Sequence, residues 1–373
     1  MNILEPEQVI RGTYKVERPI GTGAFAQVYR VKHRFMGRQA MKVFNAPDAT
    51  IEEIERDISE AVLLSSLKHP NIIEVFDANV LESHGRQYGY FTMSYMPGGT
   101  LDRYWRSYGN DLMPVDEVVA IVCQLCRGAA LAHSANPPIV HRDIKPQNIL
   151  VGFSNEGVQV RLSDFGLAKA VNPLTMLVTA RGTLGFKPPE SMHNSDSCAA
   201  DVWAIGTVLY LLLTDVMPFP LLDERDIEDA GCFLRPMRPP SIYNIHVDAG
   251  LESIIFKCLA TDAADRYANA GDLLSDIERW KPNPGSKAIG VGMSSFQSKL
   301  AMSGESQDNL KQEADEALNR ALIEAQDSSK LFFAADLLEE AISKDPNLRD
   351  RYESQLILWR KGIMHCPIIN MKK

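Results

Sequence analysis

Two short polar segments in the middle of the chain carry the residue types that phosphoryl transfer needs. The first is His141-Arg142-Asp143-Ile144-Lys145-Pro146-Gln147-Asn148, and the second, Asp164-Phe165-Gly166, begins sixteen residues after Asn148. Phosphoryl transfer requires a carboxylate beside the attacking hydroxyl and oxygen ligands for Mg²⁺. Asp143 can supply the carboxylate, and Asn148 and Asp164 can supply the ligands. We therefore predict a phosphoryl-transfer site built from these two segments.

A glycine-containing segment near the N-terminus can approach the phosphates of a nucleotide. Gly21-Thr22-Gly23-Ala24-Phe25-Ala26-Gln27-Val28 lies between two stretches of β-forming residues. Glycine lets the backbone come close to a triphosphate, whose oxygens accept backbone N–H groups. A Gly-x-Gly by itself also fits an ordinary hairpin turn. The downstream Lys42, flanked by apolar residues, favours the nucleotide loop over the turn.

These segments together resemble the protein kinase superfamily, and Lys145 after Asp143 is typical of its Ser/Thr-specific members. The resemblance covers residues 11–280 and implies an α+β, bilobal protein kinase fold. A small β-rich lobe would occupy residues 11–96, and a large helical lobe would occupy residues 97–280. The resemblance further implies ATP and Mg²⁺ as cofactors, and transfer of the γ-phosphoryl group to Ser or Thr hydroxyls of protein substrates.

The same resemblance implies roles for individual residues. Asp143 would be the catalytic base, Lys145 would reach the γ-phosphate, and Asn148 and Asp164 would hold Mg²⁺. A helix cap or a surface ion pair is the alternative for an aspartate in this position. Lys42 would bind the α- and β-phosphates and pair with Glu60, although a strand lysine is more often a solvated edge residue. The other implied nucleotide contacts are Gly21, Gly23, Val28, Ala40, Met93, Ser94, Met96 and Leu150.

Several supporting residues follow from the resemblance as well. His141 and Phe165 would pack the core that aligns the two lobes, and Asp201 would hold the backbone of the catalytic loop. The activation loop would run from Asp164 to Glu190, and Glu190 would pair with Arg266. Candidate phosphorylation sites in this loop are Thr179, which we favour as a partner of Arg142, and Thr175; either could instead be an ordinary loop residue.

Composition limits the other functions. The chain has 373 residues and a formal net charge of −9, which argues against nucleic acid or an anionic membrane as the main partner, although many ordinary soluble proteins are acidic. The longest charge-free apolar run, 202–214, is too short to span a bilayer. Cys123 and Cys126 lie in an apolar stretch and are expected to be core residues rather than metal ligands. Because no disulfide framework is evident, we expect a reducing, cytoplasmic location.

The C-terminal quarter has a different pattern. Residues 281–312 contain prolines, glycines and serines without a sustained apolar period, which predicts a linker. Residues 313–364 are predicted to be helical. The spacing of Ala334, Leu338, Ala341 and Pro346 resembles the second helix of a tetratricopeptide repeat, but a generic amphipathic hairpin is favoured because one repeat cannot bury its own face. These helices could bind a protein partner, so the alternative function is a pseudokinase or scaffold.

Overall fold

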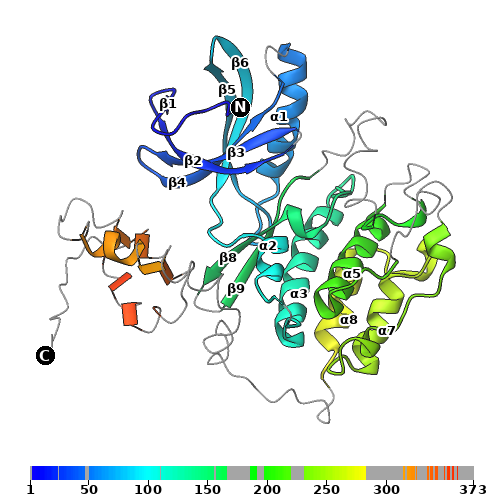
Figure 1. Cartoon of the computed structure of the whole chain (residues 1–373). Helices are drawn as coiled ribbons and strands as arrows, with labels where there is room; N and C mark the ends of the chain where they lie inside the picture. The colour runs from blue at the N-terminus through cyan, green and yellow to red at the C-terminus, as the bar shows by residue number, and fades with distance from the viewer. Residues whose placement is uncertain are drawn as a thin grey trace, which may run out of the picture. The chain divides into compact units, whose positions relative to one another are not determined.

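The computed structural model describes residues 2–23, 25–46, 50–109, 111–154, 157–165, 185–190, 197–219 and 231–282, and scattered residues between 314 and 359. The chain divides into two units, Met1–Lys287 and Ala288–Lys373. The first unit contains the two lobes expected of a protein kinase fold (Figure 1).

The small lobe is an antiparallel sheet of six strands with one helix packed beside it (Figure 1). The strand order is β1-β2-β3-β4-β6-β5, so β4 lies inside the sheet with a neighbour on each side. The helix α1 spans Ile51–Ser66, as the apolar period of residues 51–67 predicts. The strands are β1 (Val9–Ile10), β2 (Tyr14–Thr22), β3 (Ala26–His33), β4 (Gly37–Phe44), β5 (Val75–Ser83) and β6 (Arg86–Ser94).

Alternating side chains of this sheet enter two different cores. Tyr29, Val31, Met41 and Val43 belong to a cluster on the outer face, whereas the residues between them in β3 and β4 face the large lobe. The outer cluster includes Ile3 and Leu4, whose backbone N–H groups donate to the hydroxyl of Tyr29 at 2.9 and 3.1 Å. The small lobe thus includes residues on the N-terminal side of residue 11.

The large lobe is mainly helical and carries a small three-stranded sheet of order β7-β8-β9. The strands β8 and β9 pair as a hairpin, which makes up most of the chain between Asn148 and Asp164. The elements are β7 (Gly99–Thr100), α2 (Leu101–Arg106), α3 (Val115–His133), β8 (Ile149–Ser154), β9 (Gly157–Leu162), α5 (Cys198–Thr214), α7 (Ala249–Cys258) and α8 (Ala270–Arg279), with short 3₁₀ turns at Pro146–Asn148, Gly231–Leu234, Pro240–Ile242 and Ala263–Asp265.

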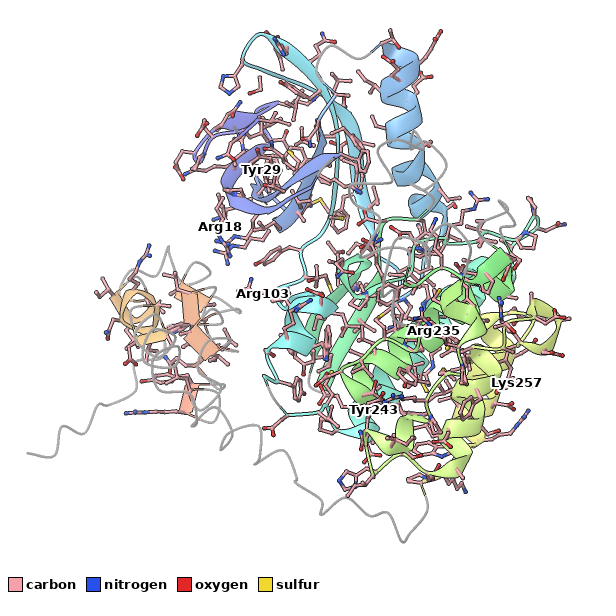
Figure 2. The ribbon with its side chains drawn as sticks, turned by 45° about the vertical axis from the view of Figure 1, so that its right-hand side comes forward. Arg18, Tyr29, Arg103, Arg235, Tyr243 and Lys257 are labelled. Atoms are coloured by element: carbon pink, nitrogen blue, oxygen red, sulfur yellow. The ribbon has the colours of Figure 1, made fainter. Side chains whose placement is uncertain are left out.

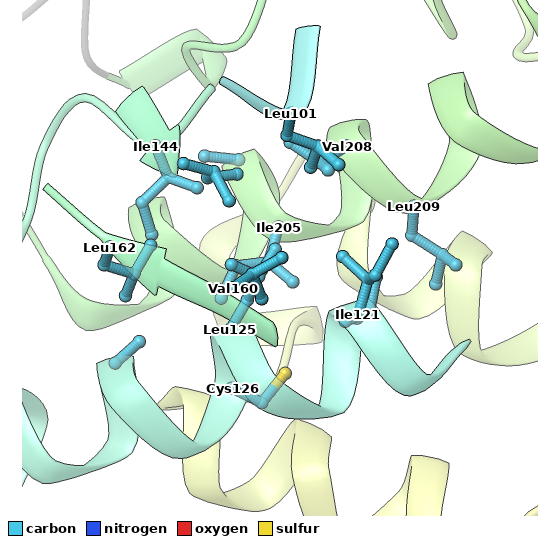
Figure 3. Packing of buried hydrophobic residues seen from close by; sticks show 14 of the residues in the cluster. Leu101, Ile121, Leu125, Cys126, Ile144, Val160, Leu162, Ile205, Val208 and Leu209 are labelled. Carbon is cyan, nitrogen blue, oxygen red and sulfur yellow. The ribbon is translucent and has the colours of Figure 1, made fainter. Parts of the chain in front are cut away.

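Helix α5 is the centre of the large lobe. Every residue from Ala199 to Thr214 is buried, which explains why the sequence shows a continuous apolar run there instead of an amphipathic stripe. Ser197 caps its N-terminus by accepting a hydrogen bond from the Ala200 backbone N–H. Figure 3 shows α5 packing with α2, α3, β9 and the catalytic loop through Leu101, Ile121, Leu125, Cys126, Ile144, Val160, Leu162, Ile205, Val208 and Leu209.

The two cysteines of the Cys-x-x-Cys segment lie on α3 and have unequal exposure. Cys126 is fully buried in the main core, and Cys123 packs against that core from a partly buried position. Burial raises the pKa of the Cys126 thiol well above its usual value. The prediction that these cysteines are core residues is therefore confirmed.

The second unit has a hydrophobic cluster of its own. Its described residues between 314 and 359 are mostly helical, and the buried members include Ala321, Leu338 and Trp359. A short helical segment can form a stable structure only by burying its apolar face against another element. The likeness to a tetratricopeptide repeat stays a prediction.

Gly206 tests the packing around α5. A Cβ at this position would lie 2.5 Å from Cβ of Cys258 on α7, an atom that is fixed to the backbone. We expect Gly206→Ala to lower the free energy of unfolding by about 1–3 kcal/mol, because overpacking outweighs the gain in helix propensity. Chemical denaturation measures this change, and a stabilised variant would contradict the packing. Added to Cys258→Gly, which removes the clashing atom, Gly206→Ala should cost less than it does alone.

Candidate active site

The catalytic loop lies between α3 and β8 and presents Asp143. Oδ2 of Asp143 lies 2.9 Å from Nζ of Lys145 and accepts a 2.7 Å hydrogen bond from Nδ2 of Asn148. The same amide donates to the backbone carbonyl of Asp143 at 2.9 Å. These contacts fix the orientation of a carboxylate whose side chain is still 20% exposed and so accessible to a substrate. They also leave Oδ1 as the atom of Asn148 that could ligate a metal ion.

Asp201 holds the backbone of this loop from below. Its carboxylate accepts hydrogen bonds from the backbone N–H groups of His141 at 2.7 Å and Arg142 at 2.9 Å. It also accepts from Nε2 of His133 at 2.9 Å, because Nδ1 of that ring accepts from the Ala270 N–H. Arg142 has φ +70°, a conformation that is unfavourable for a residue with a side chain. The role predicted for Asp201 is therefore confirmed.

Lys42 and Asp164 join the small lobe to the large lobe. Nζ of Lys42 forms an ion pair with Oδ1 of Asp164, and the Lys42 residue is 6% exposed. The ammonium also lies 5.5 Å from the ring centroid of Phe91, a cation–π contact. The alternative of a solvated edge lysine is thereby wrong. Asp164 has φ +62°, so the backbone turns sharply as it leaves β9.

His141 and Phe165 pack together beneath the catalytic residues. Their ring centroids are 4.3 Å apart, and both residues are 1% exposed. Nδ1 of His141 accepts from the Asp143 N–H, so Nε2 donates to the Ser163 carbonyl at 2.9 Å. Burial lowers the pKa of His141, which favours this neutral form. Their predicted structural role is confirmed.

The apolar residues predicted to contact adenine lie in one cluster. Ala40 and Met93 are directly opposite each other on β4 and β6, and both are buried. Val28, Met96 and Leu150 pack against the same cluster from partly buried positions on β3, on the segment between β6 and β7 (the hinge) and on β8. The structure therefore brings these five predicted residues together.

The glycine-containing segment forms the turn between β2 and β3. Gly21 pairs with Val28, and the Gly23 N–H donates to the Ala26 carbonyl at 2.9 Å. Asn45 fixes this turn to the end of β4, because its Nδ2 donates to the Gly23 carbonyl at 2.9 Å. Sequence analysis missed this role of Asn45, since an asparagine after a strand is typical of any turn.

A polar group that the sequence did not reveal fixes the strand leading to Asp164. Nδ2 of Asn71 donates to the Val160 carbonyl at 3.0 Å and to Oε1 of Gln124 at 3.1 Å. The Asn71 carbonyl in turn accepts from the Leu162 N–H at 2.9 Å. Asn71 thus links α3 and β9 by long-range contacts, which no local pattern predicts.

Glu190 and Arg266 form the predicted ion pair. Two guanidinium nitrogens of Arg266 donate to the two carboxylate oxygens of Glu190 at 2.5 and 2.9 Å. The Arg266 side chain is completely buried and also donates to the Ala260 and Thr261 carbonyls. A bidentate geometry with this many donors satisfied makes a strong buried pair. The prediction is confirmed.

Some predicted residues lie outside the described part of the structure. They include Thr175 and Thr179, with most of the predicted activation loop between 166 and 184. Glu60 belongs to α1, but its side chain is also outside the described set, so its pairing with Lys42 stays a prediction.

Comparison with known proteins identifies the family. The sequence profile of the protein kinase domain matches residues 14–276. The chain belongs to the protein kinase family. The probable serine/threonine-protein kinase PknB of Lactococcus lactis is 32% identical over 282 residues, which are 72% of this chain and 42% of that protein. The serine/threonine-protein kinase PrkC of Bacillus subtilis is 34% identical over 275 residues, which are 72% of this chain and 40% of that protein.

A solved structure shows the same fold. The kinase domain of PknI from Mycobacterium tuberculosis superimposes with a TM-score of 0.54 at 25% identity, covering 74% of this chain and 98% of that one. The chain spans about two fifths of the length of the curated relatives that it matches. Within the described residues of the kinase chain, no helix is both long and apolar enough to cross a bilayer.

Asp201→Asn tests the support of the catalytic loop. The amide has one acceptor oxygen, so at least one of the three donors around Asp201 loses its partner in a buried site. We expect the free energy of unfolding to fall by roughly 2 kcal/mol. Denaturant unfolding measures this change. Glu278→Gln is the control, because Glu278 forms a half-exposed ion pair with Arg127, and it should change stability by no more than about 0.5 kcal/mol. Equal effects would refute the role of Asp201.

His141 predicts a pH dependence of stability. Its pKa in the folded protein lies below the usual value of about 6.5, so the unfolded chain binds more protons between these two values. Stability therefore decreases as the pH falls below about 6.5, by up to about 1.4 kcal/mol per pH unit. We expect His141→Gln to remove this part of the slope in unfolding experiments between pH 7.5 and 5.5. The exposed His246, changed to Gln, should keep the wild-type slope.

Proposed function

We propose that the protein is a Ser/Thr protein kinase that transfers the γ-phosphoryl group of ATP to hydroxyl groups of protein substrates. The proposal rests on how five side chains are placed. Lys145 and Asn148 contact the carboxylate of Asp143, and Lys42 pairs with Asp164 across the two lobes. A scaffold that only bound partners would not need all five groups. The names of the relatives support the same activity.

The geometry suggests what each residue does in the reaction. The carboxylate of Asp143 would accept the proton of the substrate hydroxyl as that oxygen attacks the γ-phosphorus of ATP and ADP leaves. Lys145 lies beside this carboxylate and would stabilise the negative charge on the transferred group. Asn148 and Asp164 are the residues that would hold Mg²⁺, which neutralises phosphate charge when bound. Lys42 would contact the α- and β-phosphates.

Regulation and location form the less direct part of the proposal. We propose that Thr179 or Thr175 receives a phosphate, which Arg142 could bind through its guanidinium. The second unit, whose buried cluster gives it a core of its own, would carry a protein-binding surface on residues 313–364, after a linker over residues 281–312. A cytoplasmic location is supported by the free thiols of the five cysteines in the described residues.

A phosphotransfer assay with mapped products tests the activity. The full chain is incubated with Mg²⁺ and labelled ATP beside Asp143→Asn and Lys42→Met, and modified residues are identified by mass spectrometry. We expect the wild type to phosphorylate itself or a generic protein substrate, and each variant to lose at least about a hundredfold in rate. Thermal unfolding with Mg²⁺-ATP should show stabilisation of wild type and Asp143→Asn, and little of Lys42→Met.

Two results would contradict the proposal. Equal labelling of wild type and Asp143→Asn would show that the label comes from a contaminating kinase. A wild type that shows neither labelling nor stabilisation by Mg²⁺-ATP would favour a scaffold, which has the fold but does not catalyse the reaction.

A further inference from the structure

Several arginines gather where the small lobe meets the hinge and α2. Arg30 and Arg38 both contact Glu17, through Nε atoms at 2.5 and 3.1 Å from Oε2. The Arg30 guanidinium also lies 5.7 Å from the ring centroid of Tyr95 in the hinge. Two guanidinium groups therefore contact one carboxylate, and one of them also lies at the hinge.

Arg18 extends this positive group toward solvent. It lies directly opposite Arg30 on β2, so both side chains project from the same face of the sheet as Ala40. Arg18 is exposed, and in the described part of the chain it forms no ion pair. In Figure 2 it is labelled at the edge of the small lobe nearest the large lobe.

Arg103 adds a positive charge from the other lobe. It lies in the first turn of α2, and its Cδ is 3.7 Å from the position that a Cβ would take at Gly99, at the end of the hinge. It too is exposed and has no ion-pair partner among the described residues. The neighbouring Asp102 does not neutralise it, because its carboxylate accepts from Arg106 and Gln147. Figure 2 labels Arg103 on the same side of the molecule as Arg18.

The phosphates of a nucleotide are not the anion that these arginines would bind. Lys42, Asn148 and Asp164 mark the phosphate end of the site. Arg30 and Arg103 instead lie beside the hinge residues Tyr95 and Gly99, and Arg18 lies opposite Arg30 on β2. An anion at the hinge would therefore be one other than the nucleotide phosphates.

The catalytic loop lies beside the helix that carries Arg103. Gln147 follows Asp143 by four residues, and its Nε2 donates to Oδ1 of Asp102 at 3.0 Å. Arg103 is the next residue along α2. A protein chain that presents a hydroxyl to Asp143 and continues past Gln147 would reach Arg103 within a few residues, since an extended chain advances about 3.3 Å per residue.

We propose that Arg103 and Arg18 select substrates with acidic or phosphorylated side chains a few residues from the phosphoacceptor. Carboxylate and phosphate groups would pair with the two exposed guanidinium groups, and basic side chains would be repelled. This inference rests on the proposed kinase activity and names the substrate class of the same site. Arg103 and Arg18 are specificity residues outside the reacting atoms.

A positional peptide scan tests the proposal on the full chain. Peptides with one central Ser or Thr carry Glu, Lys or Ala in turn at each flanking position from six before to six after the acceptor, and kcat/KM is measured for each. We expect the wild type to prefer Glu over Lys at one or more positions on one side of the acceptor. Arg103→Glu and Arg18→Glu should each lower the Glu-to-Lys ratio at those positions by about threefold to tenfold, and Arg103→Gln by less. The preference should weaken as NaCl is raised, because the pairs are exposed.

A charge-matched control separates a local effect from net charge. Arg279 lies on α8, and its side chain is 76% exposed. Arg279→Glu changes the net charge by two units, as Arg103→Glu and Arg18→Glu do, but at a position far from both in the sequence. We expect this variant to keep the wild-type ratio at every position. An equal drop in the ratio with Arg279→Glu would overturn the proposal, because the effect would then come from overall charge.

Other outcomes overturn either this inference or the activity beneath it. Phosphorylation of the neutral peptides with a flat scan, or a ratio that Arg103→Glu and Arg18→Glu leave unchanged, would refute the acidic substrate class and leave the kinase activity standing. No phosphorylation of any peptide or protein by the wild type would refute the proposed function, and this inference with it.

Discussion

The buried carboxylate of Asp201 is the contact on which the geometry of the site depends. It is 1% exposed and accepts from two consecutive backbone N–H groups of the catalytic loop, one of which belongs to a residue with positive φ. A strained backbone persists only where its surroundings compensate for the strain. Asp201 lies on α5, which is buried from Ala199 to Thr214, so the central helix of the large lobe sets the position of the catalytic loop.

A second constraint joins the lobes above that loop. Lys42 lies in a central strand of the small lobe and pairs with Asp164 at the end of β9. Hydrogen bonds of Asn71 with Gln124 and with the Val160 carbonyl hold β9 in place. The residue after Asp164, Phe165, packs on the ring of His141. The charged groups that would face a nucleotide and a metal ion are therefore fixed by neutral contacts behind them.

The sequence predicted much of the fold because the local patterns agree with the tertiary structure. The helix at 51–67, the buried run at 202–214 and the strands around Lys42 were all evident from periodicity or from uninterrupted apolar character. The β-forming residues 72–76 predict a strand, which is only partly right, since Ile72 forms an isolated bridge to Leu162 and β5 begins at Val75. That segment pairs with a residue ninety positions away, which a local pattern cannot show.

The sequence by itself determined the chemical groups of the site, because phosphoryl transfer admits few residue types and their order along the chain is distinctive. Only the tertiary structure decided the supporting contacts that lie outside these motifs. The contacts of Asn45 with the glycine turn and of Asn71 with β9, and the grouping of Arg18, Arg30 and Arg103 at the hinge, come from strands and helices far apart in sequence. The physical reason is that a hydrogen bond or a local charge depends on distance in space, and folding alone brings these side chains together.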